Sequence, residues 1–252
     1  MRHLKTVFLL LILLLAGGCA SGFPTPQEAG MVPVAANLYA EPGIDDAGRA
    51  NLIQSVSAAR ELVGNAFGGV ETNPVIYACA TNDCYARVGG SHGLAAQALD
   101  DRILLSPYGL NKHFLAHEWV HAELYARMKP AAWQAVPQWF NEGLAVTISQ
   151  EPEHSESFLQ SMLDAGLPVP RPEDVYALRS LSQWGNAIGF HEKQQLVLGV
   201  RSDGNPLYAA AGQAVRPWFL RVGRAGLNDL IRRMNAGQPF DVAYQATGAG
   251  QY

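Results

Sequence analysis

The strongest constraint on the fold is the stretch LNKHFLAHEWVHAELYARM at residues 110–128, which predicts one long buried helix. Apolar and aromatic side chains go most of the way round this helix, leaving a narrow polar stripe of Lys112, Glu123 and Arg127. A helix that is apolar almost all round packs inside a protein rather than on its surface. Pro130 ends the helix, because proline cannot continue its hydrogen-bond pattern.

The same helix contains HEWVH at residues 117–121. Positions i and i+4 lie on one helix face about one turn apart, so His117 and His121 can bind one metal ion. Glu118 is then placed to take a proton from an attacking water. At this chain's histidine and glutamate content, the pattern is expected by chance on the order of 0.01 times. The alternative is a pair of core histidines with ordinary hydrogen-bond partners.

A hydrolytic zinc site needs a third protein ligand and an open position. Glu142, in WFNEGLAV, is the candidate, because the breaks at Pro130 and Pro137 allow a second helix to return antiparallel over the histidines. Apolar residues surround Glu142 in the sequence, and a glutamate in such a setting needs a partner. The alternative, favoured if Glu142 is considered without its neighbours, is a solvent-exposed glutamate on a helix.

Two other ligand patterns fit less well. His113 lies one turn before His117, and three ligands strung along two turns of one helix cannot converge on one ion, so His113 is predicted to pack or to support the site. The metzincin pattern would need glycine at position 124 and histidine at position 127. Leu124 and Arg127 stand there instead, which excludes that class.

HEWVH followed by WFNEGLA resembles the gluzincin metallopeptidases over residues 100–150. This resemblance implies a zincin-like, thermolysin-like catalytic domain with one Zn²⁺ held by His117, His121 and Glu142, and with Glu118 as general base. The G-x-M-E-N segment of the zinc aminopeptidases is missing from GLAAQALDDRILLSP. A zinc-dependent peptidase that cleaves inside a peptide or protein substrate is therefore favoured over an aminopeptidase.

The donor that stabilises the oxyanion is less clearly marked. A fainter likeness to the same clan runs from Tyr208 to Gly248, and it makes Tyr208 the first candidate and His191 the second. A purely structural role is the alternative for both residues. Arg102 and its neighbours in LDDRILLSP are predicted to form an edge strand that pairs with an extended peptide.

The N-terminus has the pattern of an export signal. MRHLK is basic, TVFLLLILLLA is an apolar run too short to span a bilayer, and AGGC follows. AGGC resembles a bacterial lipobox, which implies a signal peptide over residues 1–18 and a lipid on Cys19; cleavage after Ala20 is the alternative. Residues 19–37 are predicted to be a tether. Ala20 beside the lipidated cysteine resembles an outer-membrane sorting signal, so a periplasm-facing lipoprotein is expected.

Cys79 and Cys84 stand close together in YACATNDCYA. In an exported protein such a pair is typical of a disulfide that closes a small loop. A metal-binding pair and two free thiols are the alternatives.

Length and composition indicate the number of domains and the class of protein. The chain has 252 residues, 48% hydrophobic and 16% charged, and residues 38–252 are predicted to form one domain. Predicted strands come early and predicted helices mostly late, which indicates an α+β fold. The resemblance to the gluzincins further implies a small N-terminal sheet, a helical C-terminal lobe and the zinc site between them. Removing residues 1–18 takes two basic side chains, and 18 − 2 = 16 basic against 22 acidic gives a net charge of −6.

A net negative charge does not favour binding to the phosphates of nucleic acid, so no nucleic-acid partner is expected. Membrane contact is expected through the lipid anchor only. Two rival functions remain at this point. One is a catalytically inactive zinc-binding lipoprotein that acts as an assembly or interaction factor. The other is a structural envelope lipoprotein without a metal.

Overall fold

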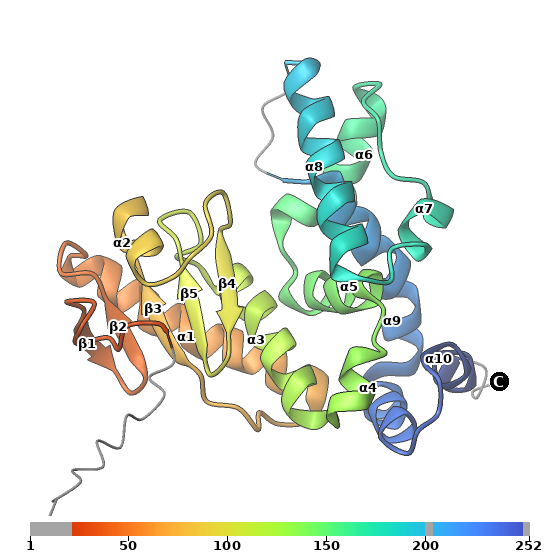
Figure 1. Ribbon diagram of the computed structural model, residues 1–252, viewed down its shortest axis with the longest axis horizontal. Helices are drawn as coiled ribbons and strands as arrows, with labels where there is room; N and C mark the ends of the chain where they lie inside the picture. The colour runs from red at the N-terminus through yellow and green to blue at the C-terminus, as the bar shows by residue number, and fades with distance from the viewer. Residues whose placement is uncertain (1–21, 200–203, 249–252) are drawn as a thin grey trace, which may run out of the picture.

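The computed structural model describes residues 22–199 and 204–248 (Figure 1). The predicted signal peptide and Cys19 lie outside the described residues. In the part that is described, an α+β architecture places a small mixed sheet before a larger set of helices, which confirms the predicted fold class.

The sheet has five strands in the order β1-β2-β3-β5-β4. Their bounds are β1 Val32–Ala35, β2 Leu38–Ala40, β3 Val75–Ala78, β4 Ala96–Leu99 and β5 Arg102–Leu105. Strand β3 pairs in parallel with β2 and β5, whereas the outer pairs β1–β2 and β4–β5 are antiparallel. The segment 94–107, which contains Arg102, is thus the β4–β5 hairpin.

The folded part begins earlier than the boundary expected at residue 38. Residues Val32–Ala35 form an edge strand rather than a tether, and Ala29 and Met31 are buried. Pro33 is tolerated there because an edge strand does not need every N–H for pairing. Asn37, with φ of +56°, turns the chain into β2.

The helices are described by their bounds as follows: α1 Asp46–Phe67, α2 Asn82–Arg87, α3 Lys112–Arg127, α4 Pro130–Gln134, α5 Gln138–Ser149, the 3₁₀ turn η1 Pro152–His154, α6 Glu156–Asp164, α7 Pro172–Tyr176, α8 Leu181–Val197, α9 Pro206–Asn235 and α10 Phe240–Gly248. Helix α8 was not predicted, because Gly185 and Gly189 lower the helix propensity of its sequence. A capping box between Ser180 and Gln183 starts it.

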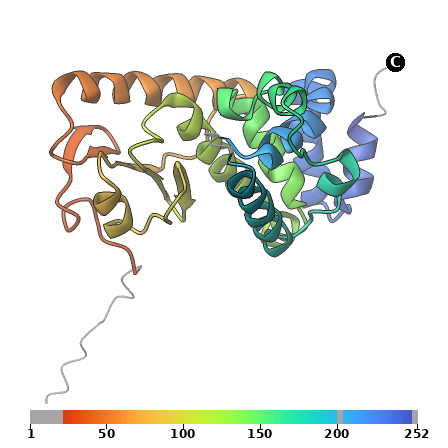
Figure 2. The ribbon, with the colours of Figure 1, turned by 90° about the horizontal axis from the view of Figure 1, so that it is seen from above.

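The two faces of the sheet are covered differently. Alternate residues of a strand point to opposite faces, so Ile76 and Ile103 face α1 and α3, while Tyr77 and Leu104 face α2 and the N-terminal segment. Seen from above, α1 runs along one side of the sheet and α2 lies on the other (Figure 2). The sulfur atoms of Cys79 and Cys84 lie 1.98 Å apart, as the expected disulfide between β3 and α2 requires.

Helix α3 is buried, as its sequence predicts, but its polar stripe is not solvent-facing throughout. The Glu123 side chain is fully buried and accepts hydrogen bonds from the backbone N–H groups of Glu71 and Thr72, at 2.9 and 2.6 Å. Nε of Arg127 donates to the same carboxylate at 2.9 Å, which forms the expected i,i+4 pair. Glu123 therefore attaches the segment before β3 to α3.

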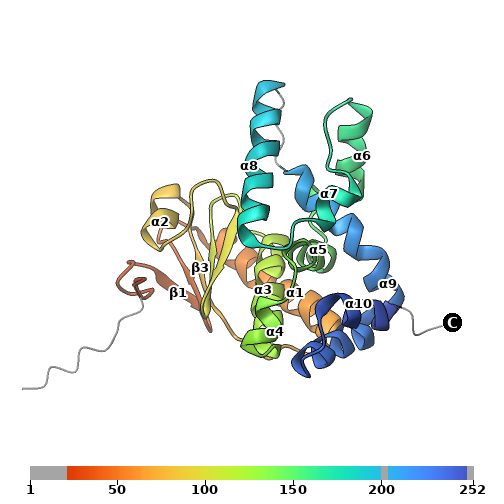
Figure 3. The same cartoon turned by 45° about the vertical axis from the view of Figure 1, so that its right-hand side comes forward.

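Helix α5 is the centre of the helical part, between α3 and α9 (Figure 3). Helix α9 kinks at Gly223, whose φ of +58° favours glycine. The candidate metal centre lies where α3 and α5 meet the edge strand β4. Among the residues described, every helix is too short or too polar to cross a lipid bilayer.

Candidate metal centre

His117 and His121 lie close together because both belong to α3, the long helix that the sequence predicts. Asn111 caps the helix, and its side-chain oxygen accepts from the N–H groups of His113 and Phe114. His117 and His121 then lie one turn apart on the face that meets α5, with ring centroids 4.9 Å apart. His113 points elsewhere, and its Nδ1 lies 2.8 Å from the carbonyl oxygen of Ser149, so its role is packing.

Helix α5 brings Glu142 to these two histidines. Oε2 of Glu142 lies 3.1 Å from Nε2 of His117 and 3.6 Å from Nε2 of His121. Ligand atoms of the three residues all lie within 4.8 Å of one another, and the group is largely buried. Such a cluster of two imidazoles and one carboxylate could hold a metal ion.

A second set of side chains orients these three groups. Oε1 of Glu151 lies 2.6 Å from Nδ1 of His117, and Oδ1 of Asn141 lies 3.0 Å from Nδ1 of His121. In both histidines an oxygen atom lies beside Nδ1, while Nε2 faces Glu142. Nε2 of Gln138 donates to Oε1 of Glu142 at 2.6 Å, which holds the carboxylate that is the third ligand candidate. Supporting contacts of this kind are what metal-binding histidines and carboxylates require.

Sequence reasoning missed Glu151. It follows Gln150, which ends α5 in the left-handed conformation with φ of +55° and turns the chain back over α3. Glycine usually marks such a turn, and here it is absent, so the sequence carried no signal for it. Asn141 stands inside the recognised WFNEGLA motif, and its position next to Glu142 is the signal that could have identified it.

The charges of the group suit a cation. Burial works to raise the pKa of Glu142, yet His121 and His117 hold that pKa well below its usual range. Burial works to lower the pKa of His117, yet Glu151 and Glu142 raise it well above its usual range. A site whose carboxylates stabilise positive charge on two imidazoles can exchange those protons for a divalent cation. The donor set therefore fits a metal ion.

Glu118 lies next to the ligand group but does not belong to it. Its Oε2 accepts a hydrogen bond from the backbone N–H of Ala98 on β4, at 2.7 Å. Burial raises its pKa, although the neighbouring His117 and His121 oppose this rise. A carboxylate with a raised pKa is suited to accept and return a proton near neutral pH.

Tyr208 lies on the first turn of α9, beside the ligand group. The centroid of its ring lies 6.0 Å from that of the His117 ring. Its ring also stacks on the ring of His154, with the centroids 4.9 Å apart. Burial, reinforced by Glu142, raises the pKa of Tyr208 well above its usual range. The hydroxyl thus stays protonated and available as a hydrogen-bond donor. His191 lines neither of the cavities described next, although it was the second candidate for this role.

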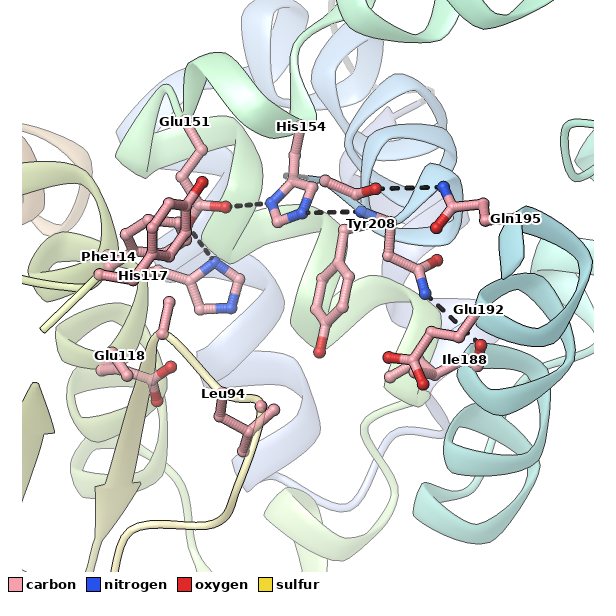
Figure 4. A pocket seen from close by; sticks show the side chains of 16 residues that line it. Leu94, Phe114, His117, Glu118, Glu151, His154, Ile188, Glu192, Gln195 and Tyr208 are labelled. Carbon is pink, nitrogen blue, oxygen red and sulfur yellow. Dashed lines mark hydrogen bonds and ion pairs between the residues drawn. The ribbon is translucent and has the colours of Figure 1, made fainter. Parts of the chain in front are cut away.

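Two cavities open on the site, one on each side. The smaller, of about 260 Å³, extends from His117 and Glu118 toward α8 and the start of α9 (Figure 4). The larger, of about 760 Å³, extends from the same two residues toward Trp133 and Arg179. Tyr208, Leu94 and Ala96 line both cavities.

The edge strand at this site is not the one expected. Arg102 lies on β5, which is paired on both sides, with β3 and β4. Strand β4 is the edge, because β5 joins the sheet through its parallel ladder with β3, a long-range pairing that the local sequence does not encode. The N–H of Ala98 bonds Glu118 rather than β5, so Ala96 and Ala98 present their backbone groups outward.

Comparison of the chain with protein-family models, with curated proteins and with solved structures finds no match.

Proposed function

We propose that this protein is a zinc-dependent peptidase of the bacterial cell envelope. The observation that carries the proposal is the convergence of His117, His121 and Glu142 beside the carboxylate of Glu118, with cavities on both sides. Two imidazoles and one carboxylate form the ligand set of hydrolytic zinc sites. A zinc ion bound there supplies a Lewis acid that lowers the pKa of water.

The residues of the chain have distinct roles in the proposed hydrolysis. Glu118 takes the proton of the attacking water and returns it to the leaving amine, which its raised pKa favours. Tyr208 donates its hydroxyl hydrogen to the oxygen that becomes negatively charged. Glu151, Asn141 and Gln138 keep the two imidazoles and the ligand carboxylate in their orientation.

An extended peptide fits the edge strand β4. The outward C=O groups of Ala96 and Ala98 and the outward N–H of Ala96 can pair with a peptide backbone, as in β-augmentation. Such a peptide would pass Glu118 and run between the two cavities. Backbone methylation of a substrate on one side of the scissile bond should then weaken binding about tenfold, as the loss of one or two hydrogen bonds predicts. Equal binding of every methylated peptide would contradict this placement.

The arrangement also bears on the rival function of a zinc-binding factor without catalysis. A structural zinc site closes its fourth position with a protein ligand, whereas cavities adjoin this group and Glu118 has no ligand role in it. We further infer a zincin-like fold, since the order of edge strand, HEWVH helix and glutamate helix agrees with the resemblance over residues 100–150.

Export and lipidation complete the proposal. The support is the N-terminal pattern that ends in AGGC, together with the cysteine pair at disulfide distance. Metabolic labelling with a fatty-acid analogue should label the wild-type protein and not the Cys19→Ala variant. Unlabelled wild-type protein found free in the periplasm would contradict the anchor.

The deciding test is the Glu118→Gln variant. It should bind about one zinc ion per chain, as wild type should, while hydrolysis of peptides falls on the order of 10²-fold or more. Cleavage profiling of envelope proteins with both forms would identify the substrates. Glu61→Gln, on the exposed side of α1, is the matched control and should behave as wild type. Equal cleavage by wild type and Glu118→Gln, or less than stoichiometric metal, would overturn the proposal.

A further inference from the structure

The smaller cavity has a charge pattern that the proposed hydrolysis does not use. Among the residues that the structure describes, three carboxylates line it, those of Glu118, Glu151 and Glu192, and no lysine or arginine does. Glu151 contacts Nδ1 of His117 and Nδ1 of His154, so it already has partners. Glu192 stands on the far wall, on α8, and within the described part of the chain it forms no ion pair with a cationic side chain.

Glu192 remains in excess even when a metal ion is counted. One divalent cation with Glu118, Glu142 and Glu151 gives 2 − 3 = −1 at the centre. The carboxylate of Glu192 adds a further negative charge at the other end of the same cavity. The cavity is therefore acidic at the metal centre and acidic at α8, which disfavours an anionic occupant and favours a cationic one.

Apolar side chains also line the cavity between these ends. Ile188 precedes Glu192 by one helical turn on the same face of α8, and Leu94 and Phe114 face it across the cavity (Figure 4). Long basic side chains combine an apolar stem with a charged head, and they bind best where the stem is covered and the head meets a carboxylate. At about 260 Å³ the cavity has room for one such side chain.

We propose that this cavity is a specificity subsite that binds a cationic nitrogen of the substrate, from the residue next to the scissile bond, through Glu192. The proposal rests on the proposed peptidase function, since it names the substrate class of that site. The nitrogen can belong to a lysine or arginine side chain or to a free α-amine. Glu192 is the group that selects it, and Ile188, Leu94 and Phe114 contact the stem.

Matched peptide substrates test this assignment. One series carries lysine, norleucine or glutamate on either side of the scissile bond, with both ends of the peptide blocked. A second series has alanine there and a free or acetylated N-terminus. Wild type should cleave the lysine peptide with a kcat/KM about fivefold above that of the norleucine peptide, as expected for one partly exposed ion pair. A preference confined to the free-amine series would identify the α-amine as the bound nitrogen.

Variants at Glu192 should change that ratio. Glu192→Gln should bring the lysine-to-norleucine ratio close to one, and Glu192→Lys should make the glutamate peptide the preferred substrate. Glu61→Gln should keep the wild-type ratio. A wild-type ratio near one in both series, or a preference that survives Glu192→Gln, would overturn the subsite.

A binding measurement separates failure of the subsite from failure of the peptidase proposal. Affinity of the same peptides is measured on full-length zinc-loaded Glu118→Gln protein and on the Glu118→Gln, Glu192→Gln double variant. Binding that favours lysine through Glu192, without cleavage by wild type, would keep the subsite and contradict the peptidase. Cleavage without any dependence on Glu192 would do the reverse.

Discussion

Oε1 of Glu151 lies 2.6 Å from Nδ1 of His117, so a carboxylate from the turn after α5 holds a metal-ligand candidate on α3. The other oxygen of Glu151 contacts Nδ1 of His154, and Ser149 donates its hydroxyl to Oε1. Burial works to raise the pKa of Glu151, but His117 keeps it below its usual range. The carboxylate is thus charged and fixed, and it directs Nε2 of His117 toward Glu142.

The first prediction follows from this contact. Glu151→Gln should lower the metal affinity about 10- to 100-fold, because the imidazole of His117 loses the charged group that orients it. Competition with a chromophoric zinc chelator measures the change. Glu156→Gln, whose exposed carboxylate lies 3.9 Å from Arg216, is the control and should bind metal as wild type does. Unchanged affinity in Glu151→Gln would show that the contact does not support the metal.

The sequence predicted the three ligand candidates but not the contact between Glu151 and His117. The positions of His117, His121 and Glu142 were predictable because helical spacing fixes two of them and proline breaks imply the return of the third. Glu151 was not predictable, because its position depends on a left-handed turn at Gln150, which is not glycine. No local pattern announces a turn of that kind.

The order of strands in the sheet was also not predictable, because it depends on pairing between distant segments. The segment 94–107 was expected to be extended, and it is, but the assignment of Arg102 to an edge strand was wrong. Which arm of the hairpin lies outside depends on the parallel pairing of β5 with β3, whose residues come from a distant segment. The acidic cavity wall was missed for a related reason, since Glu192 stands on α8, a helix that the sequence did not predict.

A second prediction concerns Tyr208. Tyr208→Phe should lower kcat on the order of 10²-fold with a smaller effect on KM, because the hydroxyl acts on charge that develops only during the reaction. The phenylalanine ring keeps the stacking on His154, so the fold and the metal content should not change. Steady-state kinetics together with metal analysis check both parts. A variant with wild-type kcat would remove Tyr208 from the mechanism.

A third prediction concerns pH and His191. Burial lowers the pKa of His191 below its usual 6.5, although Asp174 opposes this shift. A lowered pKa in the folded state means that folding favours the neutral ring, so this contribution to stability is present above pH 6.5 and is lost as the pH falls through the folded-state pKa. Wild type should therefore lose stability relative to His191→Gln on acidification.

Urea unfolding of both proteins between about pH 7.5 and pH 5 measures this difference directly. The exposed His92 provides the control, and His92→Gln should track wild type across the range. A constant gap between wild type and His191→Gln would show that His191 does not titrate differently in the folded protein.

The last prediction concerns the glycine of the NEGLA segment, Gly143. A Cβ added there would lie 2.3 Å from the carbonyl oxygen of Ala211 and 2.5 Å from Cγ2 of Val215, both on α9. Gly143→Ala should therefore cost about 1–3 kcal/mol of unfolding free energy, because the backbone of α9 must move away. In the control, Gly189→Ala, the added Cβ has no other atom within 4 Å. Because alanine has a higher helix propensity than glycine, the unfolding free energy of this variant should rise by as much as about 1 kcal/mol. Since α5 carries Glu142 and α9 carries Tyr208, Gly143→Ala should also weaken metal binding; an alanine variant as stable as wild type, with unchanged metal affinity, would contradict the close approach of the two helices.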